Sequence, residues 1–229
     1  MGQQNLNEYF TDLLQKVDLQ IQDFEDNNND LFSLCKQVID YLQEIIGELK
    51  AFIISYSFTS KEEEIYFFKE QKPIIASKII YYNTVYQFEL RFPNGSEETQ
   101  KEFIMAETDR ILAHFQRNIS FYQYYRTKAT YLDHKYFLRG KPDIHILIDN
   151  FYYEADPQFS TSYDYKVAKI LAIELFAIYL TNRLNELERR FQRQQVKNGN
   201  IKKLLRWTGT KRALVELIYA LDACGCLNK

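Results

Sequence analysis

The stretch SYDYKVAKILAIELFAIYLTNRLNELERRFQRQQ, residues 162–195, carries the most regular apolar pattern in this chain of 229 residues. Its apolar residues recur at alternating intervals of three and four, which is the repeat of one face of an α-helix. This seam consists of Ile170, Ile173, Ala177, Leu180, Leu184, Leu187 and Phe191. We predict a helix of about 30 residues, roughly 45 Å long. Its first half is apolar on several sides and should lie in the core, whereas its second half is charged outside the seam.

The seam fits two arrangements. In the first, the helix lies inside the protein against an N-terminal helical hairpin. In the second, residues 180–193 pair with a second copy of the chain, which would make a homodimer. Sustained coiled coils need more heptads than residues 180–193 offer, so we favour the first arrangement and keep the homodimer as the alternative.

Helices are also expected at the beginning of the chain. Asn5, with Glu8 three residues later, forms an N-terminal cap for the first helix. The polar run DNNND at 26–30 forms a loop, and a second helix follows with an apolar face that reaches Phe52. Because the loop is short, the two helices should pair antiparallel.

The middle of the chain alternates clear and unclear signals. A second capping box, SKEE, stands at 60–63, and Pro73 should kink or restart the helix that follows it. A further helix is predicted over 97–117. Residues 119–160 are aromatic and irregular, and the alternation near 144–153 predicts a short β-hairpin.

The predicted fold is mainly α, with two parts. Seven glycines and four prolines are few for a turn-rich β-sandwich. The loop VKNGN at 196–200 separates a helical N-terminal domain, residues 1–195, from a C-terminal module, residues 196–229. In that module Thr208 or Thr210 would cap a buried amphipathic helix.

The net charge of −2 is unevenly distributed. Residues 1–50 hold ten acidic residues against three lysines, whereas residues 183–212 hold ten basic residues against two glutamates. Such asymmetry indicates either a polyanionic partner for the basic stretch or attraction between the two ends of the chain.

The basic residues near the predicted C-terminal helix are candidates for contact with nucleic-acid phosphates. They bracket a helix start, whose free backbone N–H groups also favour phosphate oxygens. The candidates are Lys202, Lys203, Arg206, Lys211 and Arg212. The alternative is a solvated loop, neutralised in part by the acidic N-terminus.

Catalytic and metal-binding motifs are missing from the sequence. There is no glycine-rich phosphate loop, GxSxG, HExxH or CxxC motif, so we expect neither an enzyme nor a bound cofactor. One irregular cluster could in principle bind a divalent metal. It consists of Asp133, His134, Asp143, His145, Asp149 and Asp156. Their spacing is generic, and turn caps or solvated side chains are the favoured interpretation.

Targeting signals are also missing. The first residues, MGQQNLNEYF, lack the pattern of a signal peptide, and no run approaches the ~20 apolar residues that span a bilayer. Cys35, Cys224 and Cys226 are too few for a disulfide framework. We expect a reduced, soluble, cytoplasmic protein with no membrane partner and no small-molecule substrate.

Four long segments resemble the RteC family, regulatory proteins of Bacteroides conjugative transposons. They are KPIIASKIIYYNTVYQFELRFPNG (72–95), FYQYYRTKATYLDHKYFLRG (121–140), FSTSYDYKVAKILAIELFAIYL (159–180) and WTGTKRALVELIYALDACGCLN (207–228). The resemblance implies a transcriptional activator of excision genes in a tetracycline-responsive cascade, with double-stranded promoter DNA as its partner. It also implies a helical N-terminal domain followed by a DNA-binding part of winged-helix type.

The resemblance also implies that the DNA-binding part is incomplete here. RteC-like proteins continue beyond the position that matches Asn228, so we expect the groove-entering helix to be missing and assign no base-reading residue. The alternative function is a protein-interaction or dimerisation module without DNA affinity of its own.

Overall fold

The computed structural model describes residues 5–140 and 156–197, together with Ala213 and Glu216. Within these residues the secondary structure is helical and contains no strand, which confirms the mainly α fold class. The chain divides into two compact units, Met1–Glu186 and Leu187–Lys229. The division falls inside the last long helix, and the unit Met1–Glu186 positions the site described below.

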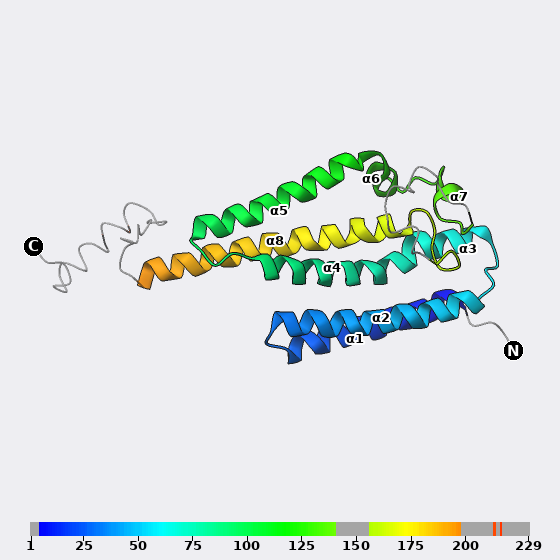
Figure 1. Ribbon diagram of the computed structural model, residues 1–229, viewed down its shortest axis with the longest axis horizontal. Helices are drawn as coiled ribbons and strands as arrows, with labels where there is room; N and C mark the ends of the chain where they lie inside the picture. Colours follow the sequence, from blue (N-terminus) through cyan, green and yellow to red (C-terminus); the bar gives the residue numbers. More distant parts are fainter. Residues whose placement is uncertain (1–4, 141–155, 198–212, 214–215, 217–229) are drawn as a thin grey trace, which may run out of the picture. The chain divides into compact units, whose positions relative to one another are not determined.

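The chain begins with an antiparallel helical hairpin (Figure 1). Helix α1, Leu6–Asn27, starts at the predicted cap, where the Asn5 side chain accepts a hydrogen bond from the backbone N–H of Asn7. Helix α2, Leu31–Ser55, is capped by Asp30 in the same way. The buried positions of α2 follow helical spacing: Cys35, Val38, Leu42, Ile45, Leu49 and Ile53. This face packs against α1 and against helix α4, Lys72–Arg91.

The third and fourth helices are joined by a wide turn. Helix α3, Lys61–Tyr66, starts at the capping box, where Ser60 accepts from the Glu63 N–H. One π-helical turn, Phe67–Gln71, then leads into α4, Lys72–Arg91, which has proline in its first turn. Pro73 has no N–H to give to the preceding turn, and the helix restarts where that donor is not needed. The predicted restart is confirmed.

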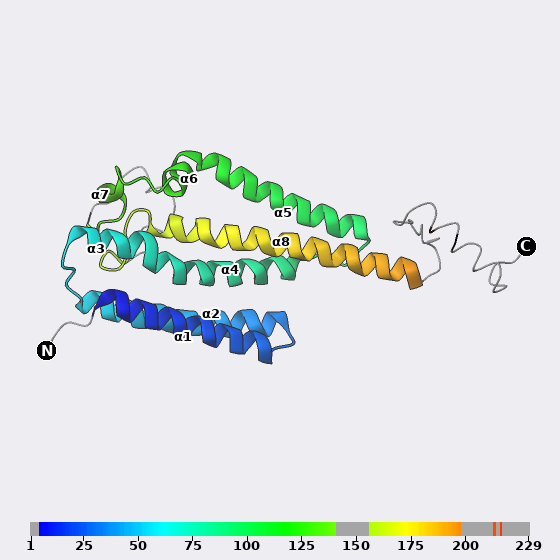
Figure 2. The same ribbon diagram turned by 180° about the vertical axis from the view of Figure 1, so that it is seen from behind.

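Helix α8, Asp164–Lys197, is the long helix predicted over 162–195. Figures 1 and 2 show it alongside α4 from both sides. Phe176 meets Phe88 of α4 edge to face, with ring centroids 5.6 Å apart. Arg183 donates from Nε to Oε1 of Glu89 over 2.8 Å.

The buried face of α8 differs in part from the predicted seam. Within Met1–Glu186 its most buried apolar side chains are Val167, Ala168, Ile170, Ala172, Phe176 and Leu180. Three predicted members, Ile173, Ala177 and Leu184, are only half-buried. A straight helix drifts by about 20° per heptad, so a strict seven-residue repeat does not stay on one face. The interior position agrees with the first of the two predicted arrangements, but the packing partner differs, because α8 lies beside α4 and not on the N-terminal hairpin.

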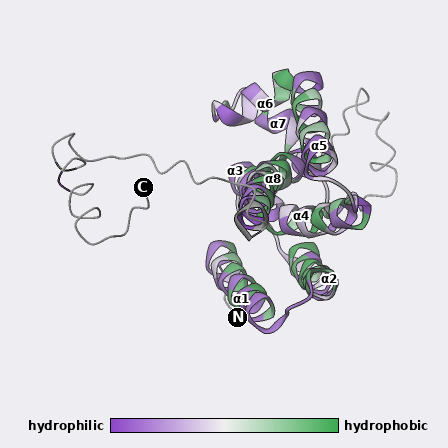
Figure 3. Cartoon of the chain, turned by 90° about the vertical axis from the view of Figure 1, so that its left-hand side faces the viewer, coloured by the Kyte–Doolittle hydropathy of each residue, from purple (hydrophilic) through white to green (hydrophobic). Residues whose placement is uncertain are grey.

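Three more helices complete this unit. Helix α5, Glu97–Arg117, has the predicted bounds, and its Phe103 ring lies 5.4 Å from that of Phe88. The two short helices are α6, Ile119–Arg126, and α7, Asp133–Tyr136. Figure 3 views α1 and α2 nearly end on, with hydrophobic and hydrophilic residues on different sides of each.

Several predictions fall outside the described residues. The β-hairpin near 144–153 is one, and the winged-helix-like module over 196–229 is another, apart from the helical Ala213 and Glu216. Neither gains support from the described helices, and the predicted domain boundary at 195/196 stays a prediction. No described helix combines the length and apolar character that crossing a membrane requires.

Candidate functional site

A cavity of about 580 Å³ opens between α2, α4 and the start of α8. Its apolar wall is built from side chains that face one another across the two helices. They are Ile39 and Ile46 of α2 and Pro73, Ala76, Ile79 and Ile80 of α4. Its polar end is the segment from Phe159 to Lys166, which leads into α8. Gln43 of α2 and Asn83 of α4 are the polar members of this wall. The cavity therefore has a mainly apolar body and one polar end.

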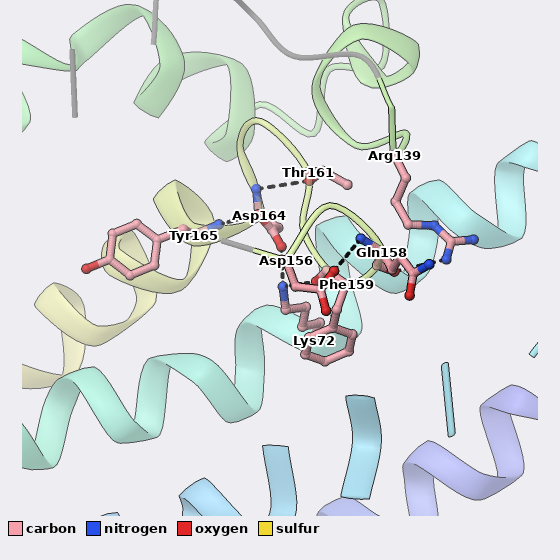
Figure 4. A network of polar contacts seen from close by, with 8 residues as sticks. All are labelled: Lys72, Arg139, Asp156, Gln158, Phe159, Thr161, Asp164 and Tyr165. Carbon is pink, nitrogen blue, oxygen red and sulfur yellow. Dashed lines mark hydrogen bonds and ion pairs between the residues drawn. The ribbon is translucent and has the colours of Figure 1, made fainter. Parts of the chain in front are cut away.

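A buried ion pair lies at the polar end. Lys72 Nζ donates to Oδ2 of Asp164 and to the backbone carbonyl of Phe159 (Figure 4). The side chains of Lys72 and Asp164 are 12% and 3% exposed. The second carboxylate oxygen of Asp164 accepts from the N–H of Tyr165, 2.8 Å away. Because a buried charge is costly without partners, this pair fixes the start of α8 against the start of α4.

The segment before α8 is held by two further cations. Lys50 of α2 lies 2.9 Å from Asp156 Oδ2, and the hydrogen bond from Lys50 lowers the pKa of that carboxyl. Arg139 donates to the Gln158 carbonyl over 3.0 Å (Figure 4). It also donates to Glu64 of α3 over 2.7 Å. These contacts, together with Lys72, hold residues 156–163 against α2, α3 and α4.

A second buried pair lies one turn earlier than Lys72. Lys69 Nζ lies 2.8 Å from both Asp133 Oδ1 and the carbonyl of Ala129. The side chains of Lys69 and Asp133 are 6% and 11% exposed. Tyr124 also donates to Asp133, and burial, together with this hydrogen bond, raises the pKa of the phenol. Lys69 lies within the π-helical turn and Lys72 follows it directly, and such turns are frequent at functional sites.

Two aspartates of the possible metal cluster are paired with lysines in the structure. Asp133 pairs with Lys69 and Asp156 with Lys50, so both carboxylates already have cationic partners. Among the described residues no group of three or more side chains could hold a metal ion. Asp143, His145 and Asp149 lie outside the described part of the chain.

The five predicted phosphate contacts also lie outside the described residues. These are Lys202, Lys203, Arg206, Lys211 and Arg212. The basic stretch begins within α8, and its first member, Arg183, pairs with Glu89. In the second unit Arg189, Arg190 and Arg193 are exposed, and none of them has an ion pair with another described residue. Spacings of three and four put Arg193 on the same side of the helix as the other two.

Sequence reasoning missed Lys69 and Lys72. Their partners stand 64 and 92 residues away along the chain, so no local pattern joins them. The available signal was two lysines in the run FFKEQKPIIA, between apolar residues and at a proline that restarts a helix.

Comparison with protein families decides where the chain belongs. The family model described as RteC protein matches residues 66–229, which is more than two thirds of the chain. The chain belongs to the RteC family. The RteC match includes Lys69, Lys72, Asp164 and the whole basic stretch. No match to the chain was found among curated proteins or among solved structures.

Proposed function

We propose that this RteC-family protein is a DNA-binding regulator of transcription, without catalytic activity, that controls excision and mobilisation genes of a conjugative transposon in a tetracycline-responsive cascade. The observation that carries the proposal is the RteC match over residues 66–229. Membership of this family suggests a regulatory role linked to conjugative transposons.

The charge of the chain supports DNA as the partner. Ten basic residues stand against two acidic ones between 183 and 212. Lys202, Lys203, Arg206, Lys211 and Arg212 would contact phosphates, and exposed arginines near the end of α8 would extend the cationic surface. Such contacts supply affinity and orientation but carry no sequence information.

A salt titration of the full chain tests this role. Binding to a promoter fragment of the excision genes is measured by fluorescence anisotropy, with a scrambled duplex of equal length for comparison. Five phosphate contacts predict a slope of about −4.5 for log affinity against log salt. The double variant K202Q/K203Q should weaken binding to both duplexes and make the slope shallower by about 1.8.

The matched control is K16Q/K61Q, which removes two exposed lysines from the unit Met1–Glu186. It should leave the slope unchanged. Absence of binding at low salt would refute the DNA-linked function. A loss confined to the promoter sequence would contradict the assignment of Lys202 and Lys203 to phosphates.

A second candidate is a protein-interaction or dimerisation module without DNA affinity. It is favoured by large apolar side chains at the surface: Met105 and Leu112 of α5 are 61% and 53% exposed, and Ile178 of α8 is 60% exposed. Exposed apolar patches mark interaction surfaces when they are contiguous. This function predicts no DNA binding at any salt concentration, with a dimer or partner complex in size-exclusion chromatography coupled to light scattering.

A further inference from the structure

We propose that the cavity between α2, α4 and the start of α8 binds a small amphipathic molecule with an apolar body and a carboxylate head. The inference goes beyond the DNA-linked role and does not rest on it, because every residue used here belongs to the unit Met1–Glu186.

The size and wall of the cavity set the body of the ligand. About 580 Å³ falls within the range of roughly 300–1,000 Å³ of small-molecule sites. Four isoleucines, with Pro73 and Ala76, line the sides. An alkyl or aromatic body of matching size would remove this wall from water, which is favourable in proportion to the apolar area covered.

Unused hydrogen-bond donors set the head of the ligand. The Lys72 ammonium has three N–H groups, and two of them meet oxygen acceptors, on Asp164 and Phe159. The ammonium also lies 4.4 Å from the centre of the Phe159 ring, which leaves the third N–H without an oxygen acceptor. Thr161, which is 6% exposed, uses its oxygen to accept from the Asp164 N–H, so its own O–H is left to donate. Both residues line the cavity, and neither has a further acceptor among the residues that the structure describes. The polar end therefore calls for an acceptor oxygen.

Charge decides that the acceptor should be anionic. Lys72 and Asp164 neutralise each other. Lys166, which also lines the cavity, lies over the Tyr163 ring at 4.9 Å and pairs with no described carboxylate. The first two backbone N–H groups of α8 are already bonded, to Thr161 and to Asp164 itself, so the surplus positive charge at this end is that of Lys166. A carboxylate satisfies the donors and the surplus charge together, whereas an ammonium head is repelled.

The test uses decanoate as the probe, below the concentration at which it forms micelles, in isothermal titration calorimetry with the full chain. Decanoate should bind with one-to-one stoichiometry, n-decanol at least tenfold more weakly, and decylammonium not at all. No binding of decanoate, or equal binding of the three probes, would overturn the proposal.

Two variants, each with a control, test whether the probe binds in the cavity. Ala76→Phe fills the cavity and should abolish decanoate binding, whereas Ala51→Phe, at an exposed position of α2, should not. Lys166→Gln removes the surplus charge and should weaken decanoate at least threefold without changing decanol. The control Lys169→Gln lies one turn further along α8, does not line the cavity and should leave both affinities unchanged.

The Ala76→Phe test and the Lys166→Gln test do not depend on each other. If Ala76→Phe does not fold, the comparison of Lys166→Gln with Lys169→Gln decides the outcome. Unchanged decanoate affinity in folded Ala76→Phe, or an equal loss in both lysine variants, would show that the probe binds elsewhere. DNA plays no part in the measurement, so failure of the DNA-linked function would leave this result standing.

Discussion

Replacement of Lys69 by methionine tests whether the buried ion pair beside the π-helical turn organises the core. Lys69 joins the π-helical turn to Asp133 of α7 and to the carbonyl of Ala129. Methionine keeps much of the side-chain volume but removes the charge and all three donors. Asp133 would then stay buried with Tyr124 as its hydrogen-bond donor.

The size of the effect follows from the burial of the pair. With side chains 6% and 11% exposed, neither partner can be rehydrated without opening the structure. Loss of one partner of such a pair costs about 3–5 kcal/mol, because the other charge is left uncompensated. With a urea m value of about 2 kcal/mol/M, the unfolding midpoint should fall by about 1.5–2.5 M.

Urea unfolding followed by circular dichroism measures this shift. Lys16→Met is the control, because Lys16 and Glu48 form a pair whose side chains are 61% and 54% exposed. The control should cost no more than about 1 kcal/mol. In a double-mutant cycle, Lys69→Met with Asp133→Asn should cost about 2 kcal/mol less than the sum of the single changes. A loss for Lys69→Met no larger than the control, or an additive cycle, would refute the reasoning.

Three further predictions concern individual side chains and turns. Burial raises the pKa of the Cys35 thiol to about 11, so about one molecule in a thousand is thiolate at pH 8. Iodoacetamide should therefore leave Cys35 unmodified in the folded protein and label it in urea, as measured by peptide mass spectrometry. Gly140 has φ +73°, so Gly140→Ala should lower the free energy of unfolding by about 1–2 kcal/mol. Gly47 lies inside α2 with open space around it, so Gly47→Ala should raise the free energy of unfolding by about 0.5–1 kcal/mol, and thermal melting distinguishes the two opposite changes. Lys50 lowers the pKa of Asp156 below its unfolded value, so the stability from this contact is complete above the unfolded pKa and is lost as the pH falls through the folded pKa. Asp156→Asn should flatten that part of a plot of stability against pH, and an unchanged plot would contradict the assignment.

Local signals in the sequence predicted the helix boundaries well. The cap at Asn5, the capping box at Ser60 and the restart at Pro73 all depend on hydrogen bonds between near neighbours. Helix α5 has the predicted bounds for the same reason, since Ser96 accepts from the N–H of Thr99. Interactions within one helical turn join residues that are close in the sequence, so the local sequence is enough to predict them.

The site could not be predicted in the same way. The cavity takes its wall from α2 and α4 and its polar end from the start of α8, three segments far apart in the sequence. Lys72 and Asp164 become partners only when those segments pack. Aspartates such as Asp133 were recognisable as polar residues in an irregular segment, but the sequence did not reveal that their partners would be lysines.

The division of the chain at Glu186 has a practical consequence for spectroscopy. The one tryptophan of the protein, Trp207, belongs to the unit Leu187–Lys229, whereas every tyrosine except Tyr219 belongs to Met1–Glu186. Fluorescence excited at the red edge of the tryptophan band therefore originates in the second unit, and tyrosine absorbance follows almost entirely the first. A single unlabelled sample can report the melting of each unit separately and show whether the two unfold together.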